Sequence, residues 1–409
     1  MAEKTNVPEI RFAGFTDPWE QRKFSDMYVV NNERNANCEL GYDRTLSIAT
    51  MTFNGGNGAA DDSLSNYKII RIGDIAFEGH TNKVHAYGRF VLNDAGDGLM
   101  SPRFSCLRPI VEQRYSFWKY YIPREESMRP ILVNATKSGT MMNELVPDDL
   151  MRESILVPCL AEQEIIGNSL SQLDHLITLH QRKYDKLAQL KKSMLDKMFP
   201  KPGERFPEIR FAGFTDPWEQ RKLGELTTIL SAARVHKEEW RTEGVPFYRS
   251  SDVMAAFNGA ENEKVFISQE LYERLGAQSG VPQKGDVMVT GGGSVGTPYI
   301  VPDDKPLYTK DADLIWIKRH AEIDPKFLYS FFVSPIFKSY IQSISHVGTI
   351  AHYTIEQVKE TPLSMPWSIV EQKAVGSFFG NLDSLITLHQ RKLELLRNTK
   401  KSLLDRMFV

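Results

Sequence analysis

The feature that most constrains this chain is a segment that occurs twice without a change. The sequence PEIRFAGFTDPWEQRK covers residues 8–23 and again residues 207–222. Exact internal repetition of this kind indicates that one structural frame is used twice. The repeated segment is rich in proline and aromatic residues, which predicts a hydrophobic clasp that packs the following insert onto a helix. Because the copies are identical, they fit a shared structural or partner-binding task better than ligand specificity.

A second pair of repeats closes each half of the chain. LDHLITLHQRK at residues 173–183 returns as LDSLITLHQRK at residues 382–392. KKSMLDKMF at residues 191–199 returns as KKSLLDRMF at residues 400–408. Each half therefore consists of a short leading segment, a long insert and a long helix.

The closing segments carry a heptad pattern, in which apolar residues alternate at spacings of four and three. A helix from Glu162 to Met198 would be roughly 55 Å long. Neither helix can leave this stripe in water, so each is the obvious partner of the other. His180 and His389 interrupt the stripe, which favours a polar group that sets the register over a metal or catalytic role. The predicted seam comprises Ile166, Leu170, Leu173, Ile177, His180, Tyr184, Leu187, Val375, Phe379, Leu382, Ile386, His389, Leu393 and Leu396.

The two inserts share little identity, yet landmarks align. GDI at residues 73–75 corresponds to GDV at residues 285–287, an apolar strand signal, and FWKYY at residues 117–121 corresponds to FLYSF at residues 327–331. Both inserts are mixed, strand-leaning and rich in loops. One fold has been kept twice while its surface diverged.

Composition excludes several classes of protein. The 41% hydrophobic and 25% charged residues are ordinary for a soluble globular protein. No apolar run is long enough to span a bilayer and the N-terminus has no apolar signal region, so we expect a cytoplasmic protein without membrane contact. Cys38, Cys106 and Cys159 form no C-x-x-C pair, which argues against structural zinc and a disulfide framework. We expect no metal site.

Net charge gives no support to nucleic-acid binding, although basic excess is common in such domains. The chain carries −2 overall. Residues 24–150 hold 13 basic and 16 acidic residues, and residues 223–360 hold 14 and 18. Any basic surface must therefore arise from the way the basic residues are placed in the fold, with the acidic residues turned away from it.

Two different inserts on one duplicated frame nevertheless suit double-stranded DNA. A frame with approximate two-fold symmetry would hold two readers at a fixed distance, and DNA presents equivalent groove faces about 34–36 Å apart. Since the inserts differ, their half-sites should differ as well. A scaffold that holds two peptide-binding modules would have the same sequence pattern.

Side chains that can bind base edges or phosphates occur in the loops of both inserts. For each one alone, a solvated loop residue is the simpler interpretation. The candidates for DNA contact are His80, Thr81, Asn82, Lys83, Tyr87, Arg89, Arg249, Ser250, Ser251, Gly292, Ser294, Thr297, His346, His352 and Tyr353.

The sequence motifs that could indicate catalysis or cofactor binding are better explained in other ways. Residues 291–296 satisfy G-x-G-x-x-G, but a dinucleotide site needs a helix to follow, and TPYIVPDDKP brings three prolines instead. Asp303-Asp304-Lys305 is better explained as an acidic turn than as a nuclease motif. No set of residues assembles into a nucleophile, base and orienting group, so we predict no catalytic residues.

Together these features resemble the specificity subunit of type I restriction–modification systems along essentially the whole chain. The similar features are the PEIRF–GF–W leading segments, the GD strands, the GT loops, a proline before Glu-Gln (Pro158 and Pro366) and the LITLHQRK helices. The resemblance implies an α+β fold in which two mixed α/β target recognition domains are joined by two long antiparallel coiled-coil helices, with pseudo-two-fold internal duplication. It divides the chain into recognition domain 1 with its leading segment (1–155), spacer helix 1 (156–200), recognition domain 2 with its leading segment (201–364) and spacer helix 2 (365–409).

The resemblance also implies function and partners. Each domain would read one half of a bipartite, asymmetric DNA target, and the helices would set the spacer. The chain would assemble with two modification (methyltransferase) subunits, and with restriction subunits when cleavage occurs. S-adenosylmethionine, ATP and Mg would bind those partners, so the complex would act as an adenine-specific methyltransferase and ATP-dependent endonuclease while this chain binds no cofactor. The rival hypotheses are a two-module protein-binding scaffold without DNA recognition and an enzyme with an unrecognised site in one insert.

Overall fold

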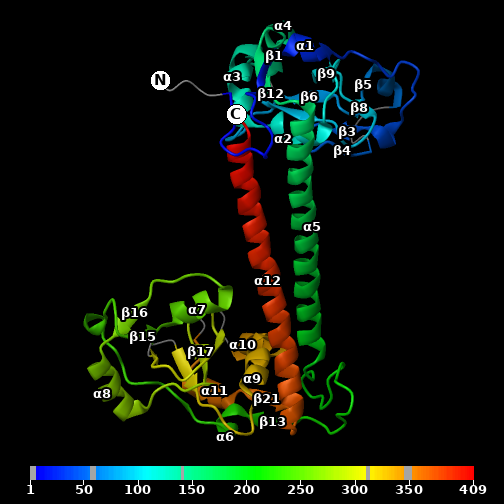
Figure 1. Ribbon diagram of the computed structural model, residues 1–409. Helices are drawn as coiled ribbons and strands as arrows, with labels where there is room; N and C mark the ends of the chain where they lie inside the picture. The colour runs from blue at the N-terminus through cyan, green and yellow to red at the C-terminus, as the bar shows by residue number, and fades with distance from the viewer. Residues whose placement is uncertain (1–5, 56–60, 140–141, 310–313, 345–351) are drawn as a thin grey trace. The chain divides into compact units, whose positions relative to one another are not determined.

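The computed structural model describes residues 6–55, 61–139, 142–309, 314–344 and 352–409 (Figure 1). The chain forms two compact units, one of residues 1–179 and 393–409 and the other of residues 180–392. Each unit contains a leading segment, an insert, the start of one long helix and the end of the other. Both are mixed α/β, so the predicted α+β fold with two domains is confirmed. In the described part of the chain, no helix is long and apolar enough to cross a membrane.

The first unit is built on a four-stranded antiparallel sheet in the order β2-β9-β6-β7. Two-stranded ladders and short helices surround it. The strands are β1 (Glu20–Lys23), β2 (Tyr28–Val30), β3 (Leu46–Ser47), β4 (Thr52–Phe53), β5 (Lys68–Ile70), β6 (Ile75–Glu78), β7 (Arg89–Leu92), β8 (Gly98–Met100), β9 (Cys106–Pro109), β10 (Thr136–Lys137), β11 (Glu144–Leu145) and β12 (Ser154–Val157). The helices of the insert are α1 (Phe24–Met27), α2 (Tyr115–Tyr121), α3 (Glu125–Ala135) and α4 (Pro147–Leu150), with 3-10 turns η1 (Tyr42–Arg44) and η2 (Asp61–Asn66).

The second unit repeats this sheet in the order β14-β20-β17-β18 and adds a three-stranded sheet, β16-β15-β19. The strands are β13 (Glu219–Lys222), β14 (Ile229–Leu230), β15 (Val245–Tyr248), β16 (Val265–Ile267), β17 (Val287–Thr290), β18 (Pro298–Ile300), β19 (Tyr308–Thr309), β20 (Leu314–Ile317) and β21 (Pro362–Met365). The helices are α6 (Leu223–Leu226), α7 (Ser250–Asn258), α8 (Gln269–Ser279), α9 (Pro325–Val333), α10 (Pro335–Ile344) and α11 (Ile355–Glu360), with the 3-10 turn η3 (Lys237–Glu239).

The GD landmarks start the equivalent strands β6 and β17. Gly73 and Gly285 have φ of 90° and 88°, a backbone conformation that favours glycine. The following carboxylate closes the turn, since Asp74 accepts the backbone N–H of Arg71 at 2.9 Å and Asp286 accepts that of Gln283 at 2.8 Å. The motif is therefore structural, and it confirms that the two inserts share one fold.

The leading segments clasp each insert to a long helix, as predicted. β1 pairs with β12, and β13 pairs with β21 in the same register. Trp19 lies in the same core as Ile166 and Leu170 of α5 (Leu160–Lys197). Arg11 and the buried carboxylate of Glu162 form two hydrogen bonds, of 2.6 and 2.7 Å. The second copy repeats this pair between Arg210 and Glu371 of α12 (Ile369–Met407), at 2.7 and 2.8 Å.

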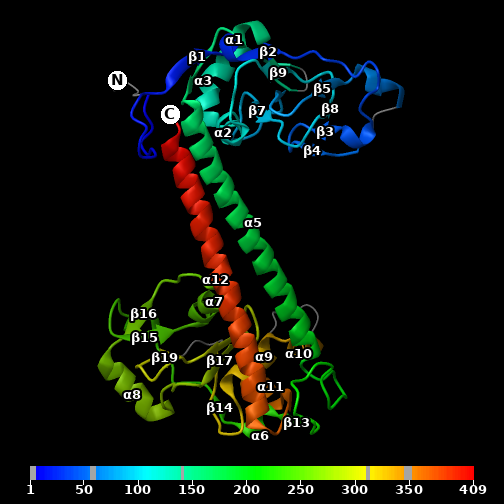
Figure 2. The same ribbon diagram turned by 45° about the vertical axis from the view of Figure 1, so that its right-hand side comes forward.

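Within each unit, the segments of α5 and α12 lie side by side in both ribbon views (Figures 1 and 2). In the second unit His180 faces His389, with 2.8 Å between their Nδ1 atoms, and Lys191 pairs with Asp383 at 2.5 Å. Residue numbers rise along one helix as they fall along the other, so the helices are antiparallel. Every predicted seam position is buried or half-buried.

The end of each long helix completes the unit of the other half. Phe408, at the end of α12, packs on Trp19, Phe117 and Tyr121, with ring centroids 5.3–6.3 Å apart. Phe199, after α5, packs in the same way on Trp218 and Phe327. Both units thus have a core that joins residues far apart in the sequence.

Candidate nucleic-acid interface

The loops that join β6 to β7 and β17 to β18 occupy the same position in the two units, because the strands belong to equivalent sheets. Most predicted DNA-contact residues fall on these loops. The first loop and its strand ends carry His80, Thr81, Asn82, Lys83, Tyr87 and Arg89, and the second carries Gly292, Ser294 and Thr297. Candidate residues of two unlike inserts thus lie at equivalent positions of the repeated fold.

The β6–β7 loop presents exposed polar side chains on an ordered turn. The side chain of His80 is 58% exposed, and its Nδ1 lies 2.5 Å from the buried carboxylate of Glu78. The side-chain oxygen of Asn82 accepts the backbone N–H groups of Val84 and His85, so Asn82 shapes the turn. Thr81 and Lys83 are exposed, which leaves them available to a ligand.

Two residues at the base of this loop have structural roles. The guanidinium of Arg89 donates to the backbone oxygen of Ala49 at 2.7 Å. The ring of Tyr87 is half-buried and lies 5.8 Å from the guanidinium carbon of Arg129. Both side chains support the loop in addition to any contact with a ligand.

A hollow of about 380 Å³ opens beside the β6–β7 loop. Its lining includes His80, Glu78, Ser101 and Arg103. Arg103 is exposed, its Nε donates to Ser101 at 3.4 Å, and it makes no ion pair within the described residues. Sequence reasoning missed Arg103, although its position in the polar segment SPRFS between two strands is a usable signal.

Two other arginines near this sheet are neutralised internally. Arg108 donates two hydrogen bonds to the buried carboxylate of Asp74, and Arg71 pairs with Glu33 and Asp97. The hydrogen bond from Arg71 is the main cause that lowers the pKa of both Glu33 and Asp97. These guanidinium groups hold the insert together, so they are not free for phosphates.

The β17–β18 loop is a tight glycine turn. The backbone N–H of Thr297 donates to the hydroxyl of Thr290 at 3.0 Å. Gly296 has φ of 82°, and a Cβ there would lie 2.4 Å from the ring of Phe337. Gly292 is buried, whereas Ser294 is exposed at the tip. The strand β18 follows this turn and no helix begins there, as the prolines of TPYIVPDDKP predict.

The remaining candidates of the second unit differ in availability. Arg249 caps α7, since its backbone N–H and its Nε both donate to Asp252, and its guanidinium also donates to the backbone oxygen of Glu263 at 2.6 Å. Ser250 begins α7 beside it. Ser251 accepts a hydrogen bond from Asn262 at 3.1 Å, within an exposed segment. Arg249 is thus a structural residue of this unit.

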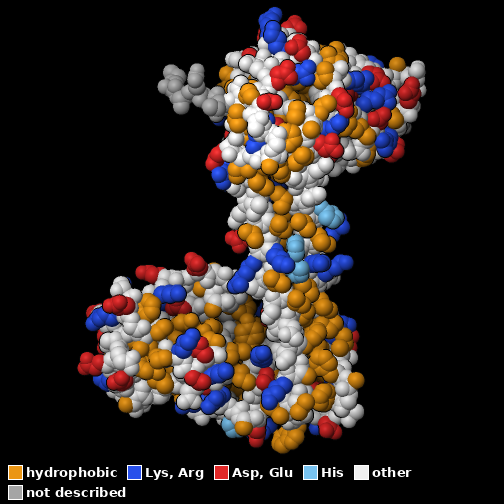
Figure 3. All heavy atoms as spheres, viewed as in Figure 1, with side chains coloured by type: hydrophobic (Ala, Val, Ile, Leu, Met, Phe, Trp, Pro, Cys, Tyr) orange, Lys and Arg blue, Asp and Glu red, His pale blue; other side chains and the backbone are white. Residues whose placement is uncertain are grey.

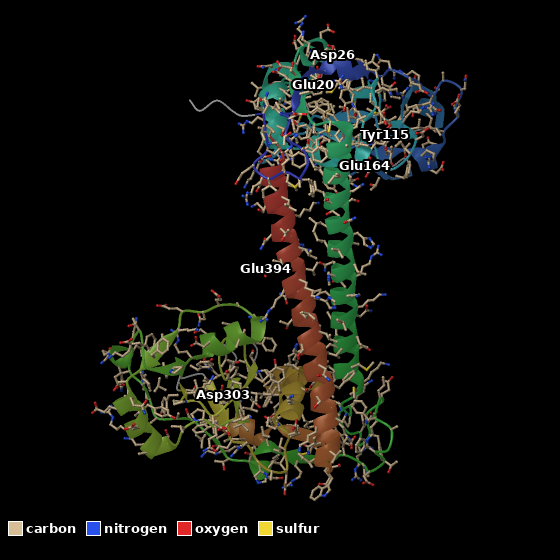
Figure 4. The ribbon with its side chains drawn as sticks, in the orientation of Figure 1. Glu20, Asp26, Tyr115, Glu164, Asp303 and Glu394 are labelled. Atoms are coloured by element: carbon tan, nitrogen blue, oxygen red, sulfur yellow. The ribbon has the colours of Figure 1, made fainter. Side chains whose placement is uncertain are left out.

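The segment at residues 352–353 lies next to the β17–β18 loop, because the backbone N–H of Tyr353 donates to Gly291 at 2.6 Å. His352 is exposed there. The side chain of Tyr353 is only 2% exposed and its hydroxyl bonds Thr361, so it belongs to the core and is not available to a base. His346 lies outside the described residues. Asp303, labelled in Figure 4, pairs with Lys305 at 3.4 Å in an acidic turn, as expected.

The fold and these loops define a class: a two-domain recognition protein whose duplicated frame presents two unlike loop surfaces. Residues 215–398 match the family model described as the type I restriction modification DNA specificity domain. The putative type I restriction enzyme MjaX specificity subunit of Methanocaldococcus jannaschii is 23% identical, over 98% of this chain and 94% of its own length. The MjaVIII specificity subunit of the same organism is 26% identical over 61% of this chain and 60% of its own length.

A crystal structure of the type I restriction–modification S subunit from M. genitalium has the same fold. It superposes with a TM-score of 0.54 at 17% identity and covers 98% of this chain and 99% of its own. This likeness at low identity shows the shared fold. The resemblance of the chain to type I specificity subunits, predicted from its repeats, is confirmed.

Proposed function

We propose that this chain is the DNA sequence-specificity subunit of a type I restriction–modification complex. Each unit reads one half of a bipartite, asymmetric target, and the paired helices set the length of the unspecified gap. The observation that best supports this function is the pair of equivalent hairpin loops, β6–β7 and β17–β18. These loops present different side chains from the same position of a repeated sheet. A shared position supports a shared task, and different side chains support different half-sites.

The proposal assigns chemistry to partner subunits. Two modification subunits, one for each half of the frame, would bind S-adenosylmethionine and methylate adenine. Restriction subunits would add ATP- and Mg-dependent cleavage. This chain would contribute recognition and no catalytic residue. The relatives named as specificity subunits of type I restriction enzymes support this division of labour.

The test is a map of methylated adenines in cells that carry the complex. Exchange of residues 24–150 for the insert of another specificity subunit should change one half-site and leave the other and the gap unchanged. The matched exchange of residues 223–360 should change only the second half-site. A continuous palindromic motif, or a change of both half-sites by one exchange, would refute two unlike readers.

DNA-binding measurements on the same complex distinguish the proposed function from that of a protein-binding scaffold. Contacts with phosphates release counterions, so the affinity for a duplex that contains the target should fall steeply as salt rises. Arg103→Ala, beside the β6–β7 loop, should weaken binding of this duplex. Affinity without salt dependence or duplex preference would favour the scaffold.

A further inference from the structure

The equivalent helices α2 and α9 pack on the long helices in the same way. A Cβ at Gly167 of α5 would lie 2.5 Å from the backbone nitrogen of Phe117 in α2. In the second unit, a Cβ at Gly376 of α12 would lie 2.6 Å from the backbone nitrogen of Phe327 in α9. Each glycine thus permits the same close approach of a helix end. The residues that follow on these helices can therefore be compared position by position between the units.

In the first unit, a tyrosine of α2 completes a carboxylate of α5. The hydroxyl of Tyr120 donates to Oδ2 of Asp174 at 2.7 Å. The other oxygen, Oδ1, accepts a hydrogen bond from Lys400 at 2.6 Å. The ammonium of Lys400 also lies 4.9 Å from the centre of the Tyr120 ring, which adds a cation–π contact. Both oxygens of this carboxylate therefore have a donor.

The second unit keeps the carboxylate and the ammonium but lacks the ring. Oδ1 of Asp383, the counterpart of Asp174, accepts a hydrogen bond from Lys191 at 2.5 Å. The counterpart of Tyr120 is Ser330, whose hydroxyl donates to the backbone of its own helix. Within the residues that the structure describes, no group donates to Oδ2 of Asp383. One carboxylate oxygen thus lacks the donor that its counterpart has.

A hollow of about 310 Å³ lies where this ring is missing, and Ser330, Gly380 and Asp383 are in its lining. Gly380 stands where the first unit has Ser171, so both changes remove side-chain atoms. The remaining wall is mainly apolar and comes from α7, β18, α9 and α12. Figure 3 shows hydrophobic side chains gathered over this face of the second unit. Volume and lining suit a small ligand that carries few polar groups.

Tyr329 contributes to this wall without completing the carboxylate. Burial raises the pKa of Tyr329 to about 12, and the charge of Asp383 adds to this rise. The ring is therefore neutral and lies near the carboxylate, but its hydroxyl makes no hydrogen bond within the described residues. The first unit has Lys119 at this position, paired with Asp94 at 2.6 Å. Tyr329 is thus a wall of the hollow that the first unit does not have.

We propose that this hollow binds a phenol, a small aromatic ring whose hydroxyl donates to Oδ2 of Asp383. The first unit contains the same contact, made by its own Tyr120. A hydrogen bond from a hydroxyl to a carboxylate is charge-assisted and strong, and the apolar wall would bury the ring. Because the lining comes from both the insert and α12, the bound ring would tie the second insert to its helix. The site does not depend on the proposed function.

Fluorine NMR of the full chain titrated with para-fluorophenol tests the site. One ring should bind per chain. Fluorobenzene, which has the same ring without the hydroxyl, should bind at least about tenfold more weakly, as expected for loss of a charge-assisted hydrogen bond. Failure of para-fluorophenol to bind, or equal affinity for the two rings, would overturn the proposal.

The two units supply matched variants that locate the ring. Ser330→Tyr with Gly380→Ser copies the first unit into the second and should abolish binding. Tyr120→Ser with Ser171→Gly does the reverse and should raise the stoichiometry to two rings per chain. Binding that survives in the filled variant would place the ring elsewhere and refute the site. A folded opened variant that still binds one ring would contradict the equivalence of the two positions.

Removal of the carboxylate tests the hydrogen bond. Asp383→Ala should lower the affinity for para-fluorophenol to that for fluorobenzene, whereas Asp174→Ala should leave it unchanged because Tyr120 occupies the first unit's position. An unchanged affinity in Asp383→Ala would refute the proposed acceptor. N-acetyl-tyrosine amide distinguishes two sources of the ring. Binding at least as tight as that of para-fluorophenol supports a tyrosine side chain of another protein, and weaker binding supports a free phenol.

Discussion

The two histidines of the seam show what a single residue contributes. His180 and His389 occupy equivalent positions, and their Nδ1 atoms lie 2.8 Å apart. Only one hydrogen bond can join two neutral imidazoles, with one ring as donor and the other as acceptor. Burial lowers the pKa of His389, and the charges of His180, Lys183 and Lys392 lower it further. His389 therefore favours the neutral form between the helices.

This pair predicts lower stability in mild acid. The folded pKa of His389 lies below its unfolded value of about 6.5, so the unfolded chain binds the extra proton. The contribution of His389 to stability is therefore complete above that value and is lost as pH falls from it through the lower folded pKa. The melting temperature should fall between pH 7.5 and 5.5 by calorimetry, and less in a variant with His180→Gln and His389→Gln. An equal fall in both proteins would assign the effect to other groups.

At the scale of elements, each long helix ends in the core of the other unit: α5 starts in the first unit and ends in the second, and α12 starts in the second and ends in the first. The backbone N–H of Ile10 donates to Arg406, and that of Ile209 donates to Lys197, both at 2.9 Å. A leading segment is thus held by two helices, one of which is remote in sequence. This arrangement explains why KKS-x-LD-x-MF is repeated: its last phenylalanine completes an aromatic cluster in each unit.

Truncation of these phenylalanines should destabilise one unit at a time. Phe408→Ala should cost the first unit about 3–5 kcal/mol, and Phe199→Ala should cost the second a similar amount, because a buried aromatic ring leaves a cavity. Hydrogen exchange followed by mass spectrometry would show lost protection in the affected unit. Phe206→Ala removes a phenylalanine that is 53% exposed and should change little. Equal loss of protection in both units would contradict separate cores.

For the whole molecule, the proposed function makes the helix pair a ruler. Seven residues inserted at equivalent positions, after Lys186 and after Leu395, preserve the heptad and add roughly 10.5 Å. At about 3.4 Å per base pair, the unspecified gap should lengthen by about three base pairs in the map of methylated adenines. The same seven residues placed between α5 and β13 should leave the gap unchanged. Methylation at the original spacing by the helix variant would contradict the ruler.

Much of this organisation follows from the sequence by itself. Exact repeats reveal the duplicated frame, and a heptad reveals which face of each helix packs, because both signals are periodic and local along the chain. The aligned GD segments identify strands β6 and β17 for the same reason. The family resemblance rests on the order of these repeated segments.

The availability of individual side chains was decided only by the tertiary structure. Arg249 and Tyr353 have residue types suited to DNA, yet one caps α7 and the other is buried against Thr361. Arg103 joins His80 at one hollow although 23 positions separate them in the sequence. Burial and hydrogen bonding depend on contacts between distant segments, which no local pattern encodes. The repeated frame was thus readable from the sequence, whereas the availability of its recognition residues depended on how the two inserts packed.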